Sequence, residues 1–573
     1  MGYDISIKAH SSGVGFVYKK NQSMKNLFLL LFCFILLSCK PVLESGNDII
    51  SFKFQEIAEA DLASISNDTV SIVVPTTTDL TALAPIIEVS PKATINPASG
   101  VKQDFSKPVF YTVTSEAGTK KSFTVLAYNQ PTFRVNNILL SDNFVTGVIN
   151  GDNILFTVPF GTSLSALIIN YTLAETAIKS NIVSGGTIDL TKPFNWTLTK
   201  GKFTKTYTLT ANVQQQETGI RAVWVTNVAS TVLFSEAGLT AMVDKLAELN
   251  FNTICVCTYN KSQTLFPSQT LANVLGLTPA QTIIAGCSWG DVLGKLIEKA
   301  HAKNIKVIAW FEYGFASHYS GQDSPISDKH PDWVSKDITG VQTNKNSFYW
   351  LNGFHPEVQK FLTDMIVECV TKYPGLDGVQ GDDRLPALPA HAGYDDYTKQ
   401  LYKSETGKDV PTNPTETAFF NWKANKMSDY AVTLYNAVKA ARSTCFVTWA
   451  PSTRGWSKDN YLQDWPEWLK RGVADWISPQ LYRNESQGID SYSPLVYSDV
   501  QNVFNSVDLR KKYVPGMLVR NGNTIVSDGF LAQLIQYNRS RGIYNESTWF
   551  YEAIPSKQKA YKALYPGKAI FPF

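Results

Sequence analysis

From residue 218 to the C-terminus at residue 573, short apolar runs alternate with longer amphipathic stretches. The apolar runs predict eight strands: Ala222–Thr226, Thr253–Cys257, Lys306–Phe311, Gly375–Gln380, Cys445–Trp449, Trp476–Gln480, Tyr513–Leu518 and Trp549–Glu552. The stretches between them predict helices over Leu239–Leu249, Trp289–Lys303, Pro356–Lys372, Ala418–Ala441, Asp464–Arg471, Tyr497–Asp508 and Asp528–Arg541. This alternation predicts an α/β fold, a (β/α)8 TIM-like barrel over 218–573. A doubly wound open sheet is the alternative, although no glycine-rich nucleotide-binding motif follows a strand.

Residues 45–214 have a different pattern, with strand-like alternation of period two and many Thr and Val residues. They also repeat at a nearly constant interval. Val74-Pro75 recurs 84 residues later as Val158-Pro159, and Asp104–Pro108 recurs 85 residues later as Asp189–Pro193. Such an interval, held across separate segments, indicates a duplication and predicts two all-β sandwich domains of immunoglobulin-like size, over 45–128 and 131–214. We favour a spacer role for this arm over carbohydrate binding.

An apolar run over residues 27–38 follows Lys19, Lys20 and Lys25. It is short for a membrane span and typical of a signal-peptide core. The run ends at Ser38 before Cys39, which resembles the lipobox of bacterial lipoproteins, so we interpret residues 1–39 as a signal peptide and Cys39 as the lipidation site. Met24 heads a more typical signal peptide than Met1. The alternatives are an ordinary signal peptide or a short anchor.

A lipidated Cys39 predicts a cell-envelope protein tied to a membrane without spanning it. The favoured location is the outer membrane, with the protein facing the periplasm or the cell surface. The formal net charge is +3, from 52 basic and 49 acidic residues, so nothing indicates a nucleic-acid partner. Cys255 and Cys257 share one face of a predicted strand and are interpreted as buried small hydrophobic residues. We therefore expect no metal and no organic cofactor.

In barrels of this kind the reactive groups lie where the strands end, because the loops there build the cleft. Acidic residues follow predicted strands 3, 4 and 8, namely Glu312, the Asp382-Asp383 pair and Glu552. Cleavage of a glycosidic bond needs two carboxyl groups, one to donate a proton and one to attack or to activate water. These four residues are therefore the candidate catalytic groups, with Asp382 the strongest candidate.

Alternation along strand 4 places Gly378, Gln380 and Asp382 on one face that opens at the barrel mouth. Asp383 faces differently and either orients Asp382, pairs with Arg384 or exchanges roles with Asp382. A simple salt bridge from Glu312 to Arg384, without catalysis, is the alternative for Glu312. The candidate substrate-binding residues combine stacking aromatic rings with polar groups from the strand ends: Tyr313, Gln380, Arg384, Trp449, Trp456, Gln480 and Tyr482.

Four segments together resemble the glycosyl-hydrolase-like 10 family: Gly219–Asn227, Ala309–Gly314, Asp377–Arg384 and Ser478–Arg483. The resemblance extends over nearly all of 218–573 and implies a (β/α)8 fold and a glycoside hydrolase acting on a poly- or oligosaccharide. The β-rich arm resembles the tandem immunoglobulin-like modules of Bacteroidetes surface lipoproteins. Asp377-Gly378 followed by Asp382 also resembles strand 4 of α-amylase-like barrels, but Gln380 stands where those enzymes carry Arg. A non-catalytic glycan-binding surface lipoprotein is the alternative function.

Overall fold

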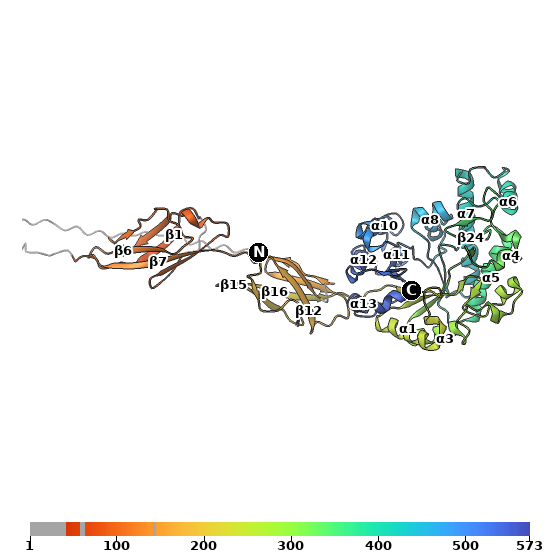
Figure 1. The fold of residues 1–573 in the computed structure, drawn as a ribbon, viewed down its shortest axis with the longest axis horizontal. Helices are drawn as coiled ribbons and strands as arrows, with labels where there is room; N and C mark the ends of the chain where they lie inside the picture. Colours follow the sequence, from red (N-terminus) through yellow and green to blue (C-terminus); the bar gives the residue numbers. More distant parts are fainter. Residues whose placement is uncertain (1–41, 58–62, 141–144) are drawn as a thin grey trace, which may run out of the picture. The chain divides into compact units, whose positions relative to one another are not determined.

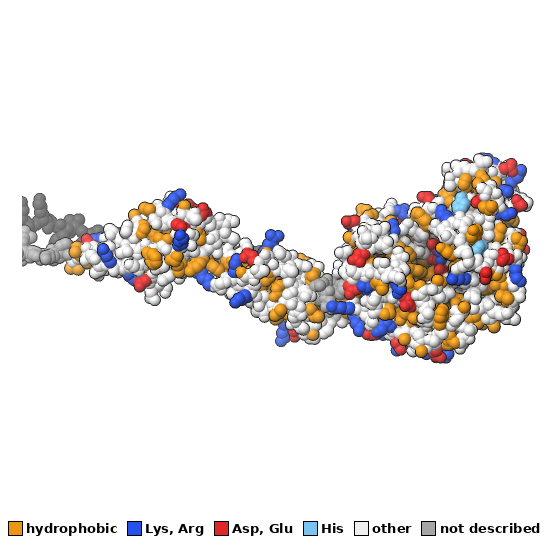
Figure 2. Space-filling view, in the orientation of Figure 1, with side chains coloured by type: hydrophobic (Ala, Val, Ile, Leu, Met, Phe, Trp, Pro, Cys, Tyr) orange, Lys and Arg blue, Asp and Glu red, His pale blue; other side chains and the backbone are white. Residues whose placement is uncertain are grey.

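The computed structural model describes residues 42–57, 63–140 and 145–573, so the predicted signal peptide, Met24 and Cys39 lie outside the described residues. The chain forms two compact units that divide between Thr132 and Phe133 (Figure 1). Within the described ranges, no helix is both long and apolar enough to cross a membrane. On the face that Figure 2 shows, basic and acidic side chains are interspersed over each unit, without a continuous field of one charge.

The first unit is all-β and contains two sheets around one core. One sheet pairs β1 (Ile49–Phe54) with β4 (Pro85–Val89). The other has the order β2-β3-β7-β6-β5, with bounds Ser64–Ser66, Thr69–Val74, Lys120–Asn129, Val109–Thr114 and Thr94–Asn96. Strand β3 buries every second side chain, as its alternating sequence predicts. Edge-to-face contacts of Phe52 with Phe54, Phe105 and Tyr111 fill the space between the sheets.

The second unit begins with another all-β region of two sheets. Its sheets have the orders β10-β11-β16-β15-β13 and β14-β12-β8-β9. The bounds are Val135–Leu140 (β8), Val145–Thr146 (β9), Val148–Asn150 (β10), Asn153–Val158 (β11), Leu167–Leu173 (β12), Lys179–Ser180 (β13), Gly186–Ile188 (β14), Phe194–Lys200 (β15) and Phe203–Val213 (β16).

Both β-rich regions contain the same unusual parallel strand pair. In the first, β3 pairs with β7 from Thr69 opposite Thr124, and in the second, β11 pairs with β16 from Asn153 opposite Thr208. Each partner recurs 84 residues later, so the repeat seen in the sequence is a repeat of strand register. The turns repeat as well, because Asp104 and Asp189 each accept a hydrogen bond from the backbone N–H two residues on, at 3.0 and 2.8 Å.

From residue 221 the chain forms a parallel sheet of eight strands in the order β27-β26-β25-β21-β18-β17-β31-β28. The bounds are Arg221–Val225 (β17), Thr253–Cys257 (β18), Lys306–Phe311 (β21), Gly378–Gly381 (β25), Phe446–Trp449 (β26), Trp476–Ile477 (β27), Gly516–Leu518 (β28) and Glu546–Trp549 (β31). The sheet curls so far that its edges meet through parallel bridges Ile477–Tyr513 and Gln480–Gly516. The predicted parallel α/β architecture is therefore confirmed.

The last strand differs from its prediction. β31 ends at Trp549, whereas the predicted strand began there, and a 3-10 helix covers Tyr551–Ser556. The sequence Glu546–Thr548 is polar, so the pattern of apolar runs does not indicate a strand there. All three side chains are nevertheless buried. Glu546, for example, binds Arg539 at 2.7 Å.

Helices follow most strands and cover the outside of the curled sheet (Figure 1). They are α1 (Glu236–Glu248), α2 (Gln269–Leu275), α3 (Val292–His301), α4 (Pro325–Lys329), α5 (Pro356–Lys372), α6 (Asp396–Thr406), α7 (Thr417–Ala441), α8 (Arg454–Tyr461), α9 (Trp465–Lys470), α10 (Ile489–Asn502), α11 (Val507–Lys511), α12 (Asp528–Ser540) and α13 (Gln558–Leu564). The main core lies between the helices and the sheet, and a second cluster fills the inside of the sheet. That inner cluster includes Cys255 and Cys257, which are buried free cysteines as predicted.

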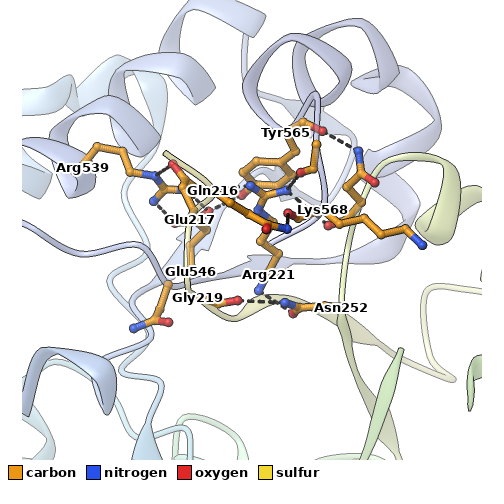
Figure 3. A network of polar contacts seen from close by, with 12 residues as sticks. Gln216, Glu217, Gly219, Arg221, Asn252, Arg539, Glu546, Tyr565 and Lys568 are labelled. Carbon is orange, nitrogen blue, oxygen red and sulfur yellow. Dashed lines mark hydrogen bonds and ion pairs between the residues drawn. The ribbon is translucent and has the colours of Figure 1, made fainter. Parts of the chain in front are cut away.

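A buried ion-pair network ties the beginning and the end of this α/β region together (Figure 3). Arg539 of α12 binds Glu217 at 2.7 Å and Glu546 of β31 at 2.7 Å. Glu217 also binds Arg221 at 3.1 Å, and the Arg221 guanidinium lies over the ring of Tyr565, 4.2 Å from its centroid. Glu217, Arg221 and Glu546 lie at the N-terminal ends of β17 and β31. The network therefore closes the sheet at the edge opposite the strand C-termini.

Candidate functional site

Glu312 and Asp382 leave the sheet side by side at its C-terminal edge. Strands β21 and β25 are neighbours, and their register places Phe311 opposite Gly381, the last residue of each strand. The residue that follows each strand is an acid, so the parallel register itself brings the two carboxylates together. Asp383 and Arg384 follow at once in the turn after β25.

Arg384 binds all three carboxylates. Its Nη2 lies 2.6 Å from Asp382 Oδ2 and 3.4 Å from Glu312 Oε1, and its Nη1 lies 2.9 Å from Asp383 Oδ1. Its Nε donates a hydrogen bond of 3.0 Å to the backbone carbonyl of Glu312. The side chain of Arg384 is only 12% exposed, so one buried cation holds three acids that come from two different strand ends.

These groups line a cavity of about 160 Å³ at the C-terminal edge of the sheet. Its lining residues are Trp310, Glu312, Asp382, Asp383, Arg384, Gln480, Tyr482 and Trp549. The expected convergence of strand-end acids is therefore found, and Gln480 and Tyr482 of the predicted binding residues accompany them. Two lining residues, Trp310 and Trp549, were missed. The sequence of strand 3 does not distinguish Trp310 from a core residue. Trp549 was not predicted because the last strand was placed too far along the chain, so that Trp549 stood at its start and not at its end.

Burial raises the pKa of Asp382 well above its usual range, and the neighbouring negative charge of Asp383 raises it further. The positive charge of Arg384 opposes this change. The pKa of Glu312 is also raised by burial, and Arg384 and Asn260 act in the opposite direction. The site therefore holds two carboxyl groups that retain a proton to higher pH than carboxyl groups in water.

Neighbouring polar groups fix both carboxylates. Gln480 Nε2 donates to Asp382 Oδ1 at 2.8 Å and to the carbonyl of Ala450 at 2.9 Å. Asn260 Nδ2 donates to Glu312 Oε2, and Cys257 Sγ lies 3.4 Å from the same oxygen. Asn260 and Cys257 were not predicted as site residues, although both come from the end of strand 2, where the search for strand-end groups could have found Asn260.

Two predicted residues lie elsewhere. Trp449 does not offer a stacking face, because it is 1% exposed, packs against Trp468 of α9 at 5.3 Å, and donates to the carbonyl of Val473 at 2.9 Å. In strand β26 the side chain of Thr448 faces inward and Trp449 must therefore face the helices. The prediction that Trp449 lines the cleft is wrong.

Glu552 does not end a strand and does not line the cavity. It lies in the 3-10 helix after β31, where its carboxylate accepts a hydrogen bond from Ser230 Oγ. Glu552 was predicted as a strand-end acid because the last strand was predicted over Trp549–Glu552. The chain has in fact already turned away from the sheet by residue 552, so that prediction is corrected.

The other predicted binding residues, Gln380, Tyr313 and Trp456, do not line the cavity. Gln380 is inside the sheet, where its Oε1 accepts from Trp224 Nε1 at 2.8 Å and its Nε2 donates to Thr448 Oγ1 at 3.1 Å. It is 1% exposed and does not line the cavity. Tyr313 is 3% exposed, and Arg384 lies 6.0 Å from its ring centroid. Trp456 of α8 is 43% exposed and remains a predicted stacking residue.

No group of three or more His, Cys, Asp or Glu side chains in the described part of the chain is arranged to hold a metal ion. Asp377 lies just before β25, at the opposite end of that strand from the carboxylate cavity, and anchors the start of the strand. It binds Lys306 at 2.9 Å and the ring of His301 at 2.7 Å.

Replacement of Arg384 by methionine is expected to destabilise the protein more at pH 8 than at pH 5. Both Asp382 and Glu312 have folded-state pKa values above their unfolded values, so stability falls as pH rises through that window. Arg384 lowers both pKa values, so its removal raises them further. The pH range over which the protein loses stability then becomes wider. Each unit of added pKa shift corresponds to on the order of 1 kcal/mol. Urea denaturation at the two pH values measures the difference.

The matched control for this experiment is Arg471→Met. Arg471 pairs with Asp429 at 2.8 Å and with Glu467 at 3.0 Å, and both partners are in contact with solvent. We expect a small loss with no difference between the two pH values. An equal loss for Arg384→Met at pH 5 and pH 8 would show that Arg384 does not set the protonation of the cluster.

A curled parallel α/β sheet with carboxylates gathered at its C-terminal edge is the architecture of a glycoside hydrolase-like domain. The family model described as glycosyl hydrolase-like 10 matches residues 219–507, and the chain belongs to this family. A second model, the N-terminal domain of surface glycan-binding proteins, matches residues 49–127 in the first unit.

Two curated relatives each match about half of the chain. Glycosyl hydrolase YngK of Bacillus subtilis (strain 168) is 24% identical over 319 residues, which are 49% of this chain and 57% of the relative. Glycosyl hydrolase DigH of Escherichia coli (strain K12) is 23% identical over 337 residues, which are 50% of this chain and 70% of the relative. This chain thus spans little more than half the length of the Bacillus subtilis protein.

Two of the solved structures that are similar to this chain come from glycoside hydrolases and have low sequence identity to it. The glycoside hydrolase domain of PgaB (BpsB) from Bordetella bronchiseptica has a TM-score of 0.47 at 15% identity, covering 60% of this chain and 97% of that domain. The catalytic domain of a β-amylase from Paenibacillus polymyxa has a TM-score of 0.42 at 12% identity, covering 61% of this chain and 99% of that domain.

Proposed function

We propose that this protein is a glycoside hydrolase that cleaves O-glycosidic bonds in a poly- or oligosaccharide, with Asp382 as the proton donor. The observation that carries the proposal is the position of Asp382 in the cavity beside Asp383 and Glu312, with its pKa raised by burial. A carboxyl group whose pKa is raised, so that it keeps its proton to higher pH than usual, suits protonation of a leaving glycosidic oxygen.

Asp383 is the better candidate for the second carboxylate. Its side chain is 20% exposed, compared with 15% for Glu312. Its Oδ1 is buried and ion-paired with Arg384 Nη1 at 2.9 Å, which holds the carboxylate in place beside Asp382. In the proposed reaction Asp382 gives its proton to the leaving oxygen as the bond to the anomeric carbon breaks. Asp383 either attacks that carbon or takes a proton from the attacking water, and Glu312 holds Arg384 in place.

The aromatic walls fit a sugar ring. The Tyr482 and Trp549 rings, which are partly exposed, line the cavity together with the carboxylates and lie 5.8 Å apart, tilted by 34°. Trp310 also borders the cavity, but it is 1% exposed and, like Trp449, offers no stacking face. Flat aromatic rings cover the C–H faces of a sugar, and the polar groups take its hydroxyls. A cavity of about 160 Å³ has the size of a single ring at the point of cleavage.

The proposal includes a lipid anchor at Cys39 and a place in the cell envelope, at the outer membrane. The match of residues 49–127 to the N-terminal domain of surface glycan-binding proteins supports this location. The same match favours the second candidate function, a non-catalytic glycan-binding lipoprotein. Metabolic labelling with a radioactive fatty acid tests the anchor, since Cys39→Ala must abolish incorporation.

The test of the enzyme proposal is incubation of the wild-type protein with a panel of bacterial and plant polysaccharides, with new reducing ends as the readout. Release of reducing ends supports a hydrolase, and proton NMR of the first product shows whether the anomeric configuration is retained or inverted. Glycan binding without any release of reducing ends would favour the non-catalytic alternative.

The pH dependence of kcat/KM distinguishes a proton donor from a base. If Asp382 is the donor, kcat/KM is constant while Asp382 is protonated and falls as pH rises through its raised pKa. If Asp382 acted as the base or the nucleophile, kcat/KM would rise through the same pKa. The profile is measured with an oligosaccharide that the panel identifies, between pH 4 and pH 9, and a limb that only rises would refute the assignment of Asp382 as the donor.

A further inference from the structure

A second hollow lies in the loops that follow strands β27 and β28. It has a volume of about 260 Å³ and is lined by Asn484, Glu485, Ser486, Leu518, Asn521, Thr524 and Val526. The last four residues come from the end of β28 and from the hairpin of β29 (Arg520–Asn521) and β30 (Thr524–Ile525). None of the seven residues lines the carboxylate cavity.

This loop pocket and the carboxylate cavity are neighbours at one edge of the sheet. Tyr482 lines the cavity, and Asn484, two residues further along the same loop, lines the pocket. Two residues of chain span at most about 7 Å, so the two Cα atoms lie within that distance. A chain-like ligand cleaved beside Asp382 would therefore reach the pocket with its adjoining residues.

The lining of the pocket suits an uncharged sugar. The side chains of Ser486, Asn521 and Thr524 form no hydrogen bond with any described residue, and they offer hydroxyl and amide groups to a ligand. Leu518 and Val526 are 8% and 5% exposed and form an apolar floor. Among the lining residues there is no Lys or Arg. Hydroxyl and amide groups over a small apolar surface match the hydroxyls and C–H faces of a neutral sugar.

The walls of the pocket are already held in position. Glu485 accepts a hydrogen bond of 2.7 Å from the backbone N–H of Ser527, which joins the loop after β27 to the loop after β28. Arg520 donates to the carbonyls of Gly522 at 2.8 Å and Glu552 at 3.2 Å, which fixes the hairpin. The charged groups nearest the pocket thus bind protein atoms, and little ordering is needed when a ligand enters.

We propose that the loop pocket is an accessory subsite that binds an uncharged sugar residue of the glycan whose bond is cleaved beside Asp382. This inference rests on the proposed function and adds to it that the substrate is a chain extending over several sugars. Removal of pocket contacts must therefore reduce the use of long substrates and leave short ones unaffected.

The experiment compares wild type with the double variant Asn521→Ala/Thr524→Val, using neutral gluco-, xylo-, malto- and chito-oligosaccharides of two to six sugars. Each lost hydrogen bond is worth about 1 kcal/mol, so the two together correspond to a decrease of about tenfold or more in kcat/KM for the longest substrate. The shortest hydrolysed substrate should be used equally well by both proteins. Asn502→Ala, an exposed asparagine of α10 outside the pocket, is the control and should match wild type at every length.

Binding of the same oligosaccharides to Asp382→Asn and to its combination with the pocket variant, measured by calorimetry, separates the two proposals. Hydrolysis by wild type with equal length dependence in the pocket variant overturns the subsite and leaves the hydrolase standing. Absence of hydrolysis together with binding that weakens in the pocket variant supports the subsite and overturns the hydrolase. Absence of both hydrolysis and binding overturns both.

Discussion

Replacement of Asp382 by asparagine is expected to lower kcat by about 10²–10⁴-fold, the contribution typical of a positioned proton donor. The amide has nearly the same shape but no proton to give to the leaving oxygen. The introduced amide also keeps an oxygen that can accept from Arg384 Nη2, which lies 2.6 Å from the carboxylate in the wild type, so the fold should survive. The measurement is the rate of hydrolysis of the oligosaccharide that the panel identifies, with circular dichroism to confirm folding.

The matched control is Asp508→Asn, the same chemical change at a carboxylate that is 88% exposed on α11. This variant should hydrolyse the substrate at the wild-type rate. A folded Asp382→Asn protein with wild-type activity would refute the role of Asp382, and the search for the donor would move to Glu312, the other carboxyl group with a raised pKa.

Replacement of Arg539 by methionine is expected to lower the free energy of unfolding of the α/β region by about 3–5 kcal/mol, because it leaves buried carboxylates without their cation. Glu546 is 1% exposed and Glu217 is 9% exposed at the side chain, and Arg539 binds both (Figure 3). Tryptophan fluorescence in a urea titration is a suitable readout. Of the 13 Trp residues only Trp196 precedes residue 218, so the signal reports on this region.

For this experiment Arg471→Met again provides the comparison, because it removes an arginine whose acidic partners remain in contact with water. We expect its effect to stay below about 1 kcal/mol. If the two arginine variants lose the same stability, the network at the N-terminal edge of the sheet does not contribute as proposed. The carboxylate cavity lies at the other ends of the strands, so any hydrolytic activity measured below the denaturation midpoint should be unchanged in Arg539→Met.

The local pattern of apolar and polar residues was sufficient to predict those elements in which the apolar residues are buried and the polar residues are exposed. Strands β18 and β21 and helix α5 have the predicted bounds, because their apolar residues follow the period of the element they form. The prediction failed where buried residues are polar. The strand Glu546–Trp549 is hidden in the sequence, since Glu546 is buried only by virtue of Arg539 and Tyr565, which come from other elements. Helix α10 begins at Ile489, eight residues before the predicted start.

The same contrast holds for the candidate site. Adjacent positions in the chain were enough to single out Asp382, Asp383 and Arg384, and the position after a predicted strand singled out Glu312. The sequence did not indicate which aromatic rings face the cavity, because a strand that is buried on both faces has no polar side to orient it. Trp449 and Trp310 therefore look alike in the sequence. Only the direction of each side chain places Trp449 against α9 and Trp310 in the cavity.

The sequence by itself determined the all-β repeat, the parallel α/β region and the acids at the strand ends, because these depend on periodicity and on neighbours within a few residues. The tertiary structure decided which of those acids meet. Glu312 and Asp382 are joined by the register of β21 and β25 and by one buried arginine, whereas Glu552 is carried away by a turn after a strand that pattern alone could not locate. Contacts between distant segments set burial and charge, and no local pattern records them.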